Sequence, residues 1–135
     1  MIVIDTNLVA YALIEGARTA LAFQVQEKDA QWRLPVLWQH EFLNILATYV
    51  QHAGMEPHEA LAIWDRALTL LTPCERLVDM TLALHLALTH RVSAYDAQFI
   101  ALAQSLNVVC LTEDRRLLKA FPHRTMSMRQ FCSQF

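Results

Sequence analysis

Residues 2–5 read Ile-Val-Ile-Asp, a short β-branched run that ends in a carboxylate. A run of this length and composition is typical of a buried β-strand. Further short runs occur at 34–36, 73–77, 108–111 and, more weakly, 124–127. Continuous apolar strands are characteristic of parallel sheets that are covered on both faces.

Helical patterns fill the spaces between these runs. An apolar stripe extends over 37–53, and Pro57 opens a second helix that continues to about residue 71. We expect its inward-facing residues to be Leu61, Trp64, Leu68 and Leu71.

Two more helices are predicted, one from about Val78 to Thr89 and one from Ala94 to Leu106 with Ser93 as its N-cap. Helices that alternate with short apolar strands form crossover connections between parallel strands. The sequence therefore predicts the α/β class, as a three-layer α/β/α sandwich with a short, mostly parallel central sheet.

The length of 135 residues predicts a single domain that spans 1–135. The hydrophobic fraction is 55% and the charged fraction only 18%, which indicates a covered sheet together with an apolar surface for a partner. The net charge of −2 argues against a protein that binds nucleic acid by phosphate neutralisation alone.

The cysteines and the N-terminal residues help to predict the cellular compartment of the protein. Cys74, Cys110 and Cys132 are widely spaced and contain no CxxC pair, as expected for reduced thiols of an intracellular protein. Asp5 and Asn7 interrupt any signal-peptide core, and no apolar segment is long enough to span a membrane. We therefore expect a cytoplasmic protein without a membrane partner.

Four acidic residues occupy positions where a carboxylate is costly. Asp5 ends the first run and Asp114 follows the run 108–111, so both are expected at the carboxyl edge of the sheet, where α/β proteins bind ligands. Glu41 and Asp96 lie on the apolar stripes of their helices, near the helix starts. Buried carboxylates repel one another unless a cation joins them, and oxygen ligands suit Mg²⁺ or Mn²⁺.

Each acid also has a purely structural interpretation. Asp5 would cap the following helix, and Asp96 would complete a capping box with Ser93. Glu41 would pair with an arginine at an interface, and Asp114 would be an ordinary loop residue. These interpretations predict no common location for the four side chains, whereas a metal site requires one.

Four sequence pieces together resemble a PIN domain, and specifically the small VapC-like toxin ribonucleases of prokaryotic toxin–antitoxin pairs. They are Ile-Val-Ile-Asp-Thr-Asn at 2–7, His-Glu-Phe-Leu-Asn at 40–44, Tyr-Asp-Ala at 95–97 and Leu-Thr-Glu-Asp at 111–114. The resemblance implies a PIN-like fold and a Mg²⁺- or Mn²⁺-dependent endoribonuclease that leaves a 5′-phosphate. It also implies a homodimer and a cognate antitoxin that inserts a segment into the active-site groove.

Carried over residue by residue, the resemblance assigns the metal-binding acids to Asp5, Glu41, Asp96 and Asp114. It assigns a catalytic hydroxyl to Thr112 and a supporting polar position, which is also a candidate substrate contact, to Asn7. Many relatives carry a further acid shortly after the fourth one, whereas Arg115, Arg116 and Leu117 follow Asp114 here. One metal ion is therefore expected, and a second only when the substrate supplies phosphate oxygens.

Basic and aromatic residues supply candidate RNA contacts. Arg115, Arg116 and Lys119 are predicted to hold the RNA backbone, with a solvated helix face as the alternative. Trp32 and Trp38 are candidates for base stacking, although burial is the more common role of tryptophan. The apolar helices at 17–27 and 57–71 are candidate surfaces for the dimer and the antitoxin.

Two other functions are alternatives to the ribonuclease. A catalytically silent PIN-like module that binds RNA or protein is favoured only by the missing downstream acid. A phosphatase with a strand-end aspartate as nucleophile would need Asp-x-Asp, but Thr6 and Asn7 follow Asp5.

Overall fold

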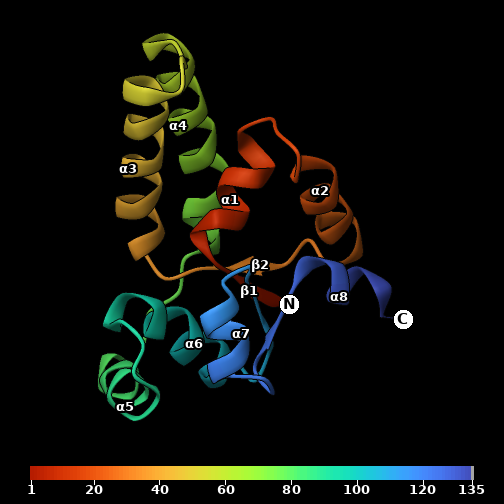
Figure 1. Cartoon of the computed structure of the whole chain (residues 1–135), viewed down its shortest axis with the longest axis vertical. Coiled ribbons are helices and arrows are strands. Elements are labelled where there is room, and N and C mark those ends of the chain that lie inside the picture. The colour runs from red at the N-terminus through yellow and green to blue at the C-terminus, as the bar shows by residue number, and fades with distance from the viewer. Residues whose placement is uncertain (135) are drawn as a thin grey trace.

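The computed structural model describes residues 1–134 and contains a four-stranded sheet between layers of helices (Figure 1). Its strands are β1 (Ile2–Ile4), β2 (Trp32–Arg33), β3 (Cys110–Leu111) and β4 (Thr125–Met126). Their order is β2-β1-β3-β4, and every neighbouring pair is parallel. The predicted three-layer α/β/α sandwich is confirmed.

The helices follow the predicted alternation with the strands. They are α1 (Thr6–Leu13), α2 (Thr19–Lys28), α3 (Leu37–His52), α4 (Pro57–Leu71), α5 (Met80–His90), α6 (Ala94–Leu106), α7 (Arg115–Ala120) and α8 (Met128–Ser133), with a 3₁₀ turn η1 (Thr72–Cys74). Figure 1 shows α1 and α2 on one side of the sheet, α6 and α7 on the other, and the α3–α4 hairpin rising beside α1. None of the described helices is long and apolar enough to cross a membrane.

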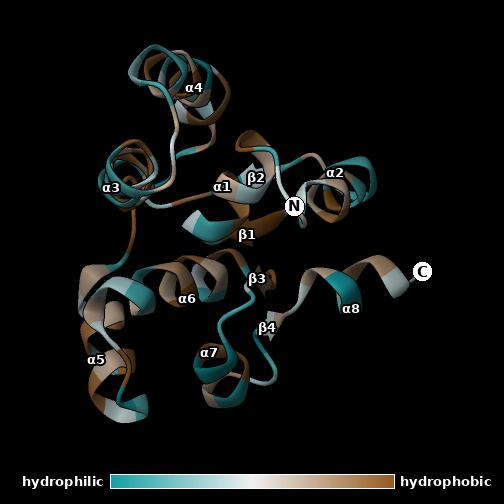
Figure 2. Ribbon diagram, turned by 45° about the horizontal axis from the view of Figure 1, so that its top comes forward, coloured by the Kyte–Doolittle hydropathy of each residue, from teal (hydrophilic) through white to brown (hydrophobic). Residues whose placement is uncertain are grey.

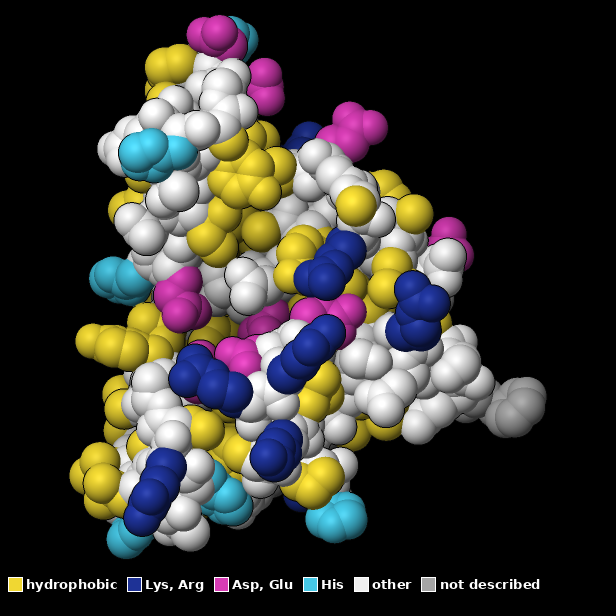
Figure 3. Space-filling view, in the orientation of Figure 1, with side chains coloured by type: hydrophobic (Ala, Val, Ile, Leu, Met, Phe, Trp, Pro, Cys, Tyr) yellow, Lys and Arg dark blue, Asp and Glu magenta, His cyan; other side chains and the backbone are white. Residues whose placement is uncertain are grey.

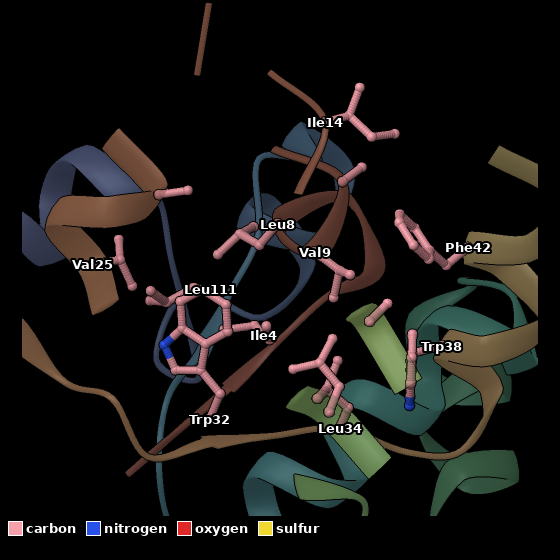
Figure 4. Close-up of a cluster of buried hydrophobic side chains, with 14 of the residues drawn as sticks. Ile4, Leu8, Val9, Ile14, Val25, Trp32, Leu34, Trp38, Phe42 and Leu111 are labelled. Carbon is pink, nitrogen blue, oxygen red and sulfur yellow. The ribbon is translucent and has the colours of Figure 1, made fainter. Parts of the chain in front are cut away.

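Successive side chains of β1 point to opposite faces of the sheet, so the strand contributes to two hydrophobic cores, one on each face. Ile2 and Ile4 pack into a cluster with residues of α1, α2, β2 and α3, which Figure 4 shows in close-up. Val3 faces the opposite side and packs against α6 residues such as Phe99 and Ile100. The apolar colour of β1 in Figure 2 reflects this burial on both faces.

Three sequence expectations about this architecture are wrong. The predicted strand at 73–77 is instead η1 followed by an isolated bridge between Leu34 and Glu75, because Pro73 has no N–H to donate to a ladder. The second strand lies at Trp32–Arg33 rather than 34–36, since the register Ile2 with Trp32 sets its position and Pro35 follows. Leu61 is exposed on α4 rather than directed inward.

The strand order creates a topological switch point between β1 and β3. From β1 the chain builds β2 on one side, and it later adds β3 and β4 on the other. Crossovers at such a point diverge from each other and leave a crevice beyond the carboxyl ends of the two central strands. Asp5 and Thr112 directly follow these two strand ends.

Candidate active site

A hollow of about 300 Å³ lies at this switch point. Its lining combines polar residues and an apolar floor: Asp5, Thr6, Asn7, Glu41, Asn44, Ile45, Asp96, Phe99, Asp114 and Leu117. All four predicted acids are therefore brought together from four separate segments of the chain. Figure 3 shows acidic side chains gathered in the central hollow, with Lys and Arg side chains around it.

Asp5 is the most deeply buried of the four acids, with 8% of its surface exposed. It is the N-cap of α1, and its Oδ1 accepts a hydrogen bond from the Leu8 N–H at 3.2 Å. Its Oδ2 accepts a hydrogen bond from the Thr112 hydroxyl at 2.6 Å. Asp5 thus fulfils the capping interpretation and also lines the hollow.

Burial raises the pKa of the Asp5 carboxyl to about 6, because an ionised carboxylate loses hydration there. The hydrogen bonds from Thr112 and Leu8 oppose this shift, and the nearby charges of Glu41 and Asp96 add to it. Hydrogen bonds therefore oppose the cost of burying the Asp5 carboxylate, whereas the Arg116 guanidinium acts on Asp96 rather than on Asp5.

Thr112 joins two of the acids through one fully buried hydroxyl. The hydroxyl donates to Asp5 and accepts a hydrogen bond from the Asp114 N–H at 3.0 Å. Asp114 in turn caps α7, because its Oδ1 accepts from the Arg116 N–H at 2.8 Å. Asp114 is therefore a fixed helix cap rather than an ordinary loop acid.

Glu41 projects from α3 and has a hydroxyl partner in α1. Its Oε1 accepts a hydrogen bond from Thr6 Oγ1 at 2.6 Å, which replaces the arginine pairing considered from the sequence. Burial, followed by the charge of Asp96, raises its pKa, while the Thr6 hydrogen bond lowers it. Thr6 was not among the predicted site residues, although its hydroxyl directly follows a strand-end acid in the sequence.

Asp96 lies in the first turn of α6, where its backbone N–H donates to the Ser93 hydroxyl at 3.0 Å. A reciprocal capping box forms at Ser127 and Gln130 in α8, whereas at Ser93 only this first hydrogen bond is present within the described chain. The Asp96 side chain lines the hollow, where burial and the charge of Asp114 raise its pKa, while the Ser93 side chain and the Arg116 charge lower it.

A sequence profile of the PIN domain matches residues 2–122. The chain belongs to the PIN domain family. Among curated proteins, Ribonuclease VapC3 of Pyrobaculum aerophilum is 28% identical over 127 residues, which cover 90% of this chain and 95% of that protein. The crystal structure of PAE2754 from the same organism matches 97% of this chain and 92% of that chain with a TM-score of 0.72, at 16% sequence identity. The last comparison shows the shared fold, and the family resemblance inferred from the four sequence pieces is confirmed.

The remaining predicted residues of this PIN domain fall into two groups. Asn7 lines the hollow, and Arg115, Arg116 and Lys119 are exposed on α7, which begins directly after Asp114. Trp32 and Trp38, in contrast, are buried in the core, so the stacking role considered for them is wrong. Their indole N–H groups donate to the Asp29 carbonyl and the Glu75 carboxylate, respectively.

The donor set of the PIN domain hollow fits a divalent cation chemically, because all four acids offer carboxylate oxygens, which Mg²⁺ and Mn²⁺ prefer. No lysine or arginine within residues 1–134 forms an ion pair with any of them. As placed, however, no three acidic, histidine or cysteine side chains in this part of the chain are arranged to hold a metal ion. Several of these carboxylate oxygens accept hydrogen bonds instead, from the Leu8 and Arg116 N–H groups and from the Thr112 and Thr6 hydroxyls.

Proposed function

We propose that this PIN domain is a Mg²⁺- or Mn²⁺-dependent endoribonuclease that hydrolyses RNA phosphodiester bonds. The observation that carries the proposal is the meeting of four carboxylates in one hollow without an ion-pair partner among the described residues. The similarity to Ribonuclease VapC3 along 95% of that protein supports the same activity. We further propose that residues 1–135 form one nuclease domain that works in the cytoplasm.

Asp5, Glu41, Asp96 and Asp114 are the residues that would hold the ion. When bound, a divalent cation supplies Lewis acidity toward a phosphate and lowers the pKa of water. Thr112 keeps the Asp5 and Asp114 segments in register, because its hydroxyl contacts both. Water must attack in line with the leaving oxygen, which requires the phosphate to be held in a fixed position. Contacts that hold the RNA backbone therefore affect the rate of cleavage as well as the affinity for RNA.

Basic side chains on α7 would bind the RNA backbone. Arg115, Arg116 and Lys119 are exposed beside Asp114, and Asn7 lines the hollow itself. We propose that they contact phosphate oxygens of the RNA backbone, which fixes its position without reading sequence.

Cleavage of a mixed RNA pool in Mg²⁺, Mn²⁺ or EDTA tests this function. We expect cleavage with either ion, none in EDTA, and fragments that carry 5′-phosphates. A catalytically silent module is the alternative, and it would bind RNA or protein without cutting under any of these conditions. Calorimetry with Mn²⁺ alone separates the two, since a silent module has no need to bind the ion.

We also propose that the protein is the toxin of a type II toxin–antitoxin pair. A second hollow, of about 320 Å³, lies between α1, α2 and α4 and has mainly apolar walls. Phe23 and Leu70 stand exposed at its lining, which would suit an apolar segment of a cognate antitoxin. Co-purification with the product of a small adjacent reading frame, lost on Leu70→Glu, would support this partner.

We propose that the protein forms a homodimer through α5. The helix reads Met-Thr-Leu-Ala-Leu-His-Leu-Ala-Leu-Thr-His and contains no Asp, Glu, Lys or Arg. Ala83 and Ala87 pack against α6, while Leu84 and Leu88 are exposed on the outer face and Leu77, just before the helix, is 98% exposed. The exposed part of the helix also carries Thr81 and His85, but its exposed leucines favour cover by a partner. An uncharged stripe packs against its own copy without repulsion, as a two-fold interface requires.

The double substitution Leu84→Glu with Leu88→Glu is expected to convert the dimer to a monomer, because four carboxylates would then face one another across the two-fold axis. Size-exclusion chromatography with light scattering measures the mass. Leu43→Glu is the control, since Leu43 is an exposed leucine on α3, outside α5 and outside the candidate surfaces at 17–27 and 57–71. A wild-type protein that is monomeric at high concentration would contradict the proposed interface.

A further inference from the structure

We propose that Tyr95 forms a stacking platform for an unpaired base next to the scissile phosphate, so that the substrate must be single-stranded at this point. The inference rests on the proposed nuclease function and names the class of RNA that the same site accepts.

Tyr95 is 64% exposed, the largest exposed fraction of any aromatic side chain in the described chain. The other exposed aromatics are Phe23 on α2 and Tyr49, eight residues beyond Glu41 on α3. Neither of them lines the acidic hollow or adjoins one of its acids in sequence. Tyr95 is therefore the exposed ring that lies beside the candidate active site.

The helical position of Tyr95 directs it toward the mouth of the hollow. Phe99, four residues further along α6, lines the hollow, and residues four apart share one helix face. Side chains on a helix also lean toward its N-terminus, and Asp96 in the first turn of α6 lines the hollow. Tyr95 is not itself a lining residue, but it lies on the turn of α6 that borders the hollow, one turn before Phe99.

The rim also carries a positive charge next to the same carboxylate. Arg116, on α7, lies close enough to Asp96 to influence its ionisation. Tyr95 precedes Asp96 in α6, and Arg116 lies near the Asp96 carboxylate. An aromatic ring and a guanidinium group near one acid provide the two elements that proteins use to bind single strands, a stacking surface and a cation for the backbone. A base inside a duplex is already stacked on both faces, so it has no face to offer the ring.

No role in the fold accounts for the ring of Tyr95. It belongs to none of the hydrophobic clusters, and its hydroxyl forms no hydrogen bond with a residue in the part of the chain described here. The buried tryptophans considered earlier cannot stack on a base, because their rings lie within the core. Tyr95 therefore offers the base-stacking surface that was expected at Trp32 and Trp38.

Binding is tested in an Asp5→Asn background, in which cleavage does not consume the RNA. Fluorescence anisotropy measures the affinity of the Tyr95→Leu and Tyr95→Phe variants for a short labelled RNA of mixed sequence. Each variant is titrated with the RNA as a single strand and as a duplex. We expect Tyr95→Leu to weaken single-strand binding about tenfold and to leave duplex binding unchanged, while Tyr95→Phe keeps the affinity because it keeps the ring. Tyr49→Leu is the control, since it removes an exposed ring remote from the hollow.

Cleavage by the same Tyr95 variants with Asp5 intact provides the second measurement. If stacking stabilises the ground and transition states equally, its loss in Tyr95→Leu is expected to raise KM about tenfold at constant kcat, while Tyr95→Phe keeps the wild-type KM. Unchanged affinity in Tyr95→Leu, or equal losses for single strand and duplex, would overturn the inference. If the wild type cuts no RNA but single-strand binding still depends on the ring, the nuclease proposal fails while the stacking platform stands.

Discussion

Replacing Asp5 by asparagine is expected to reduce RNA cleavage by a factor on the order of 10³ or more while leaving the fold intact or slightly more stable. Asparagine keeps the oxygen that accepts the Leu8 N–H, so the cap of α1 survives. It removes the negative charge that the proposed cation requires. Because burial raises the pKa of Asp5 from 3.8 to about 6, its ionised form costs the fold about 3 kcal/mol at neutral pH, and asparagine avoids that cost.

Asp79→Asn is the matched control for this substitution. Asp79 is also an N-cap, and its Oδ1 accepts from the Leu82 N–H at 3.0 Å, but it lies outside the hollow at the start of α5. The control variant should cut RNA at the wild-type rate. Initial cleavage rates and urea unfolding of both variants make the comparison, and an Asp5→Asn protein with the original rate would refute a catalytic role for Asp5.

The meeting of the four acids was predictable because a parallel sheet converts local sequence signals into a common location. The β-branched run at 2–4 identifies β1, so Asp5 falls at its carboxyl end, and the run before Thr112 does the same for β3. The helix α3 follows β2 and begins near the same edge, which brings Glu41 to it. The helix α6 follows α5 and leads into β3, so its first turn, with Asp96, lies at the edge where β3 ends. Periodicity and strand ends were sufficient for this part of the site.

Features that depend on distant partners were not predictable in this way. β2, β3 and β4 have two residues each, and their limits follow from pairing with neighbouring strands rather than from their own composition. The Thr6 hydroxyl reaches Glu41 across 35 positions of sequence, a contact that no local pattern contains. The exposure of Leu61 likewise depends on how α4 is oriented against α3, which a helical stripe alone does not determine.

In the absence of divalent cations, the site acids are expected to make the free energy of unfolding larger at about pH 5 than at about pH 8. The folded-state pKa of Asp5, about 6, lies above its ordinary value of 3.8, so the folded protein holds a proton that the unfolded chain releases between these values. Stability therefore falls as the pH rises through this window. Asp5 alone contributes about 1 kcal/mol to the difference, and the raised pKa values of Glu41 and Asp96 act in the same direction.

Mn²⁺ is expected to reverse this order, since the ion binds ionised carboxylates and protons compete with it at low pH. A free ion concentration one hundred times its Kd would add about 2.7 kcal/mol to the free energy of unfolding, which exceeds the loss from Asp5. Urea unfolding at both pH values, in EDTA and in Mn²⁺, gives the four free energies that are needed. Asp5→Asn should flatten the pH dependence and weaken the response to Mn²⁺, because it removes the acid with the largest resolved cost. The opposite result would be a free energy of unfolding in EDTA that rises from pH 5 to pH 8. It would show that ionisation of the site carboxylates does not destabilise the fold, and the argument for a cation in this hollow would then fail.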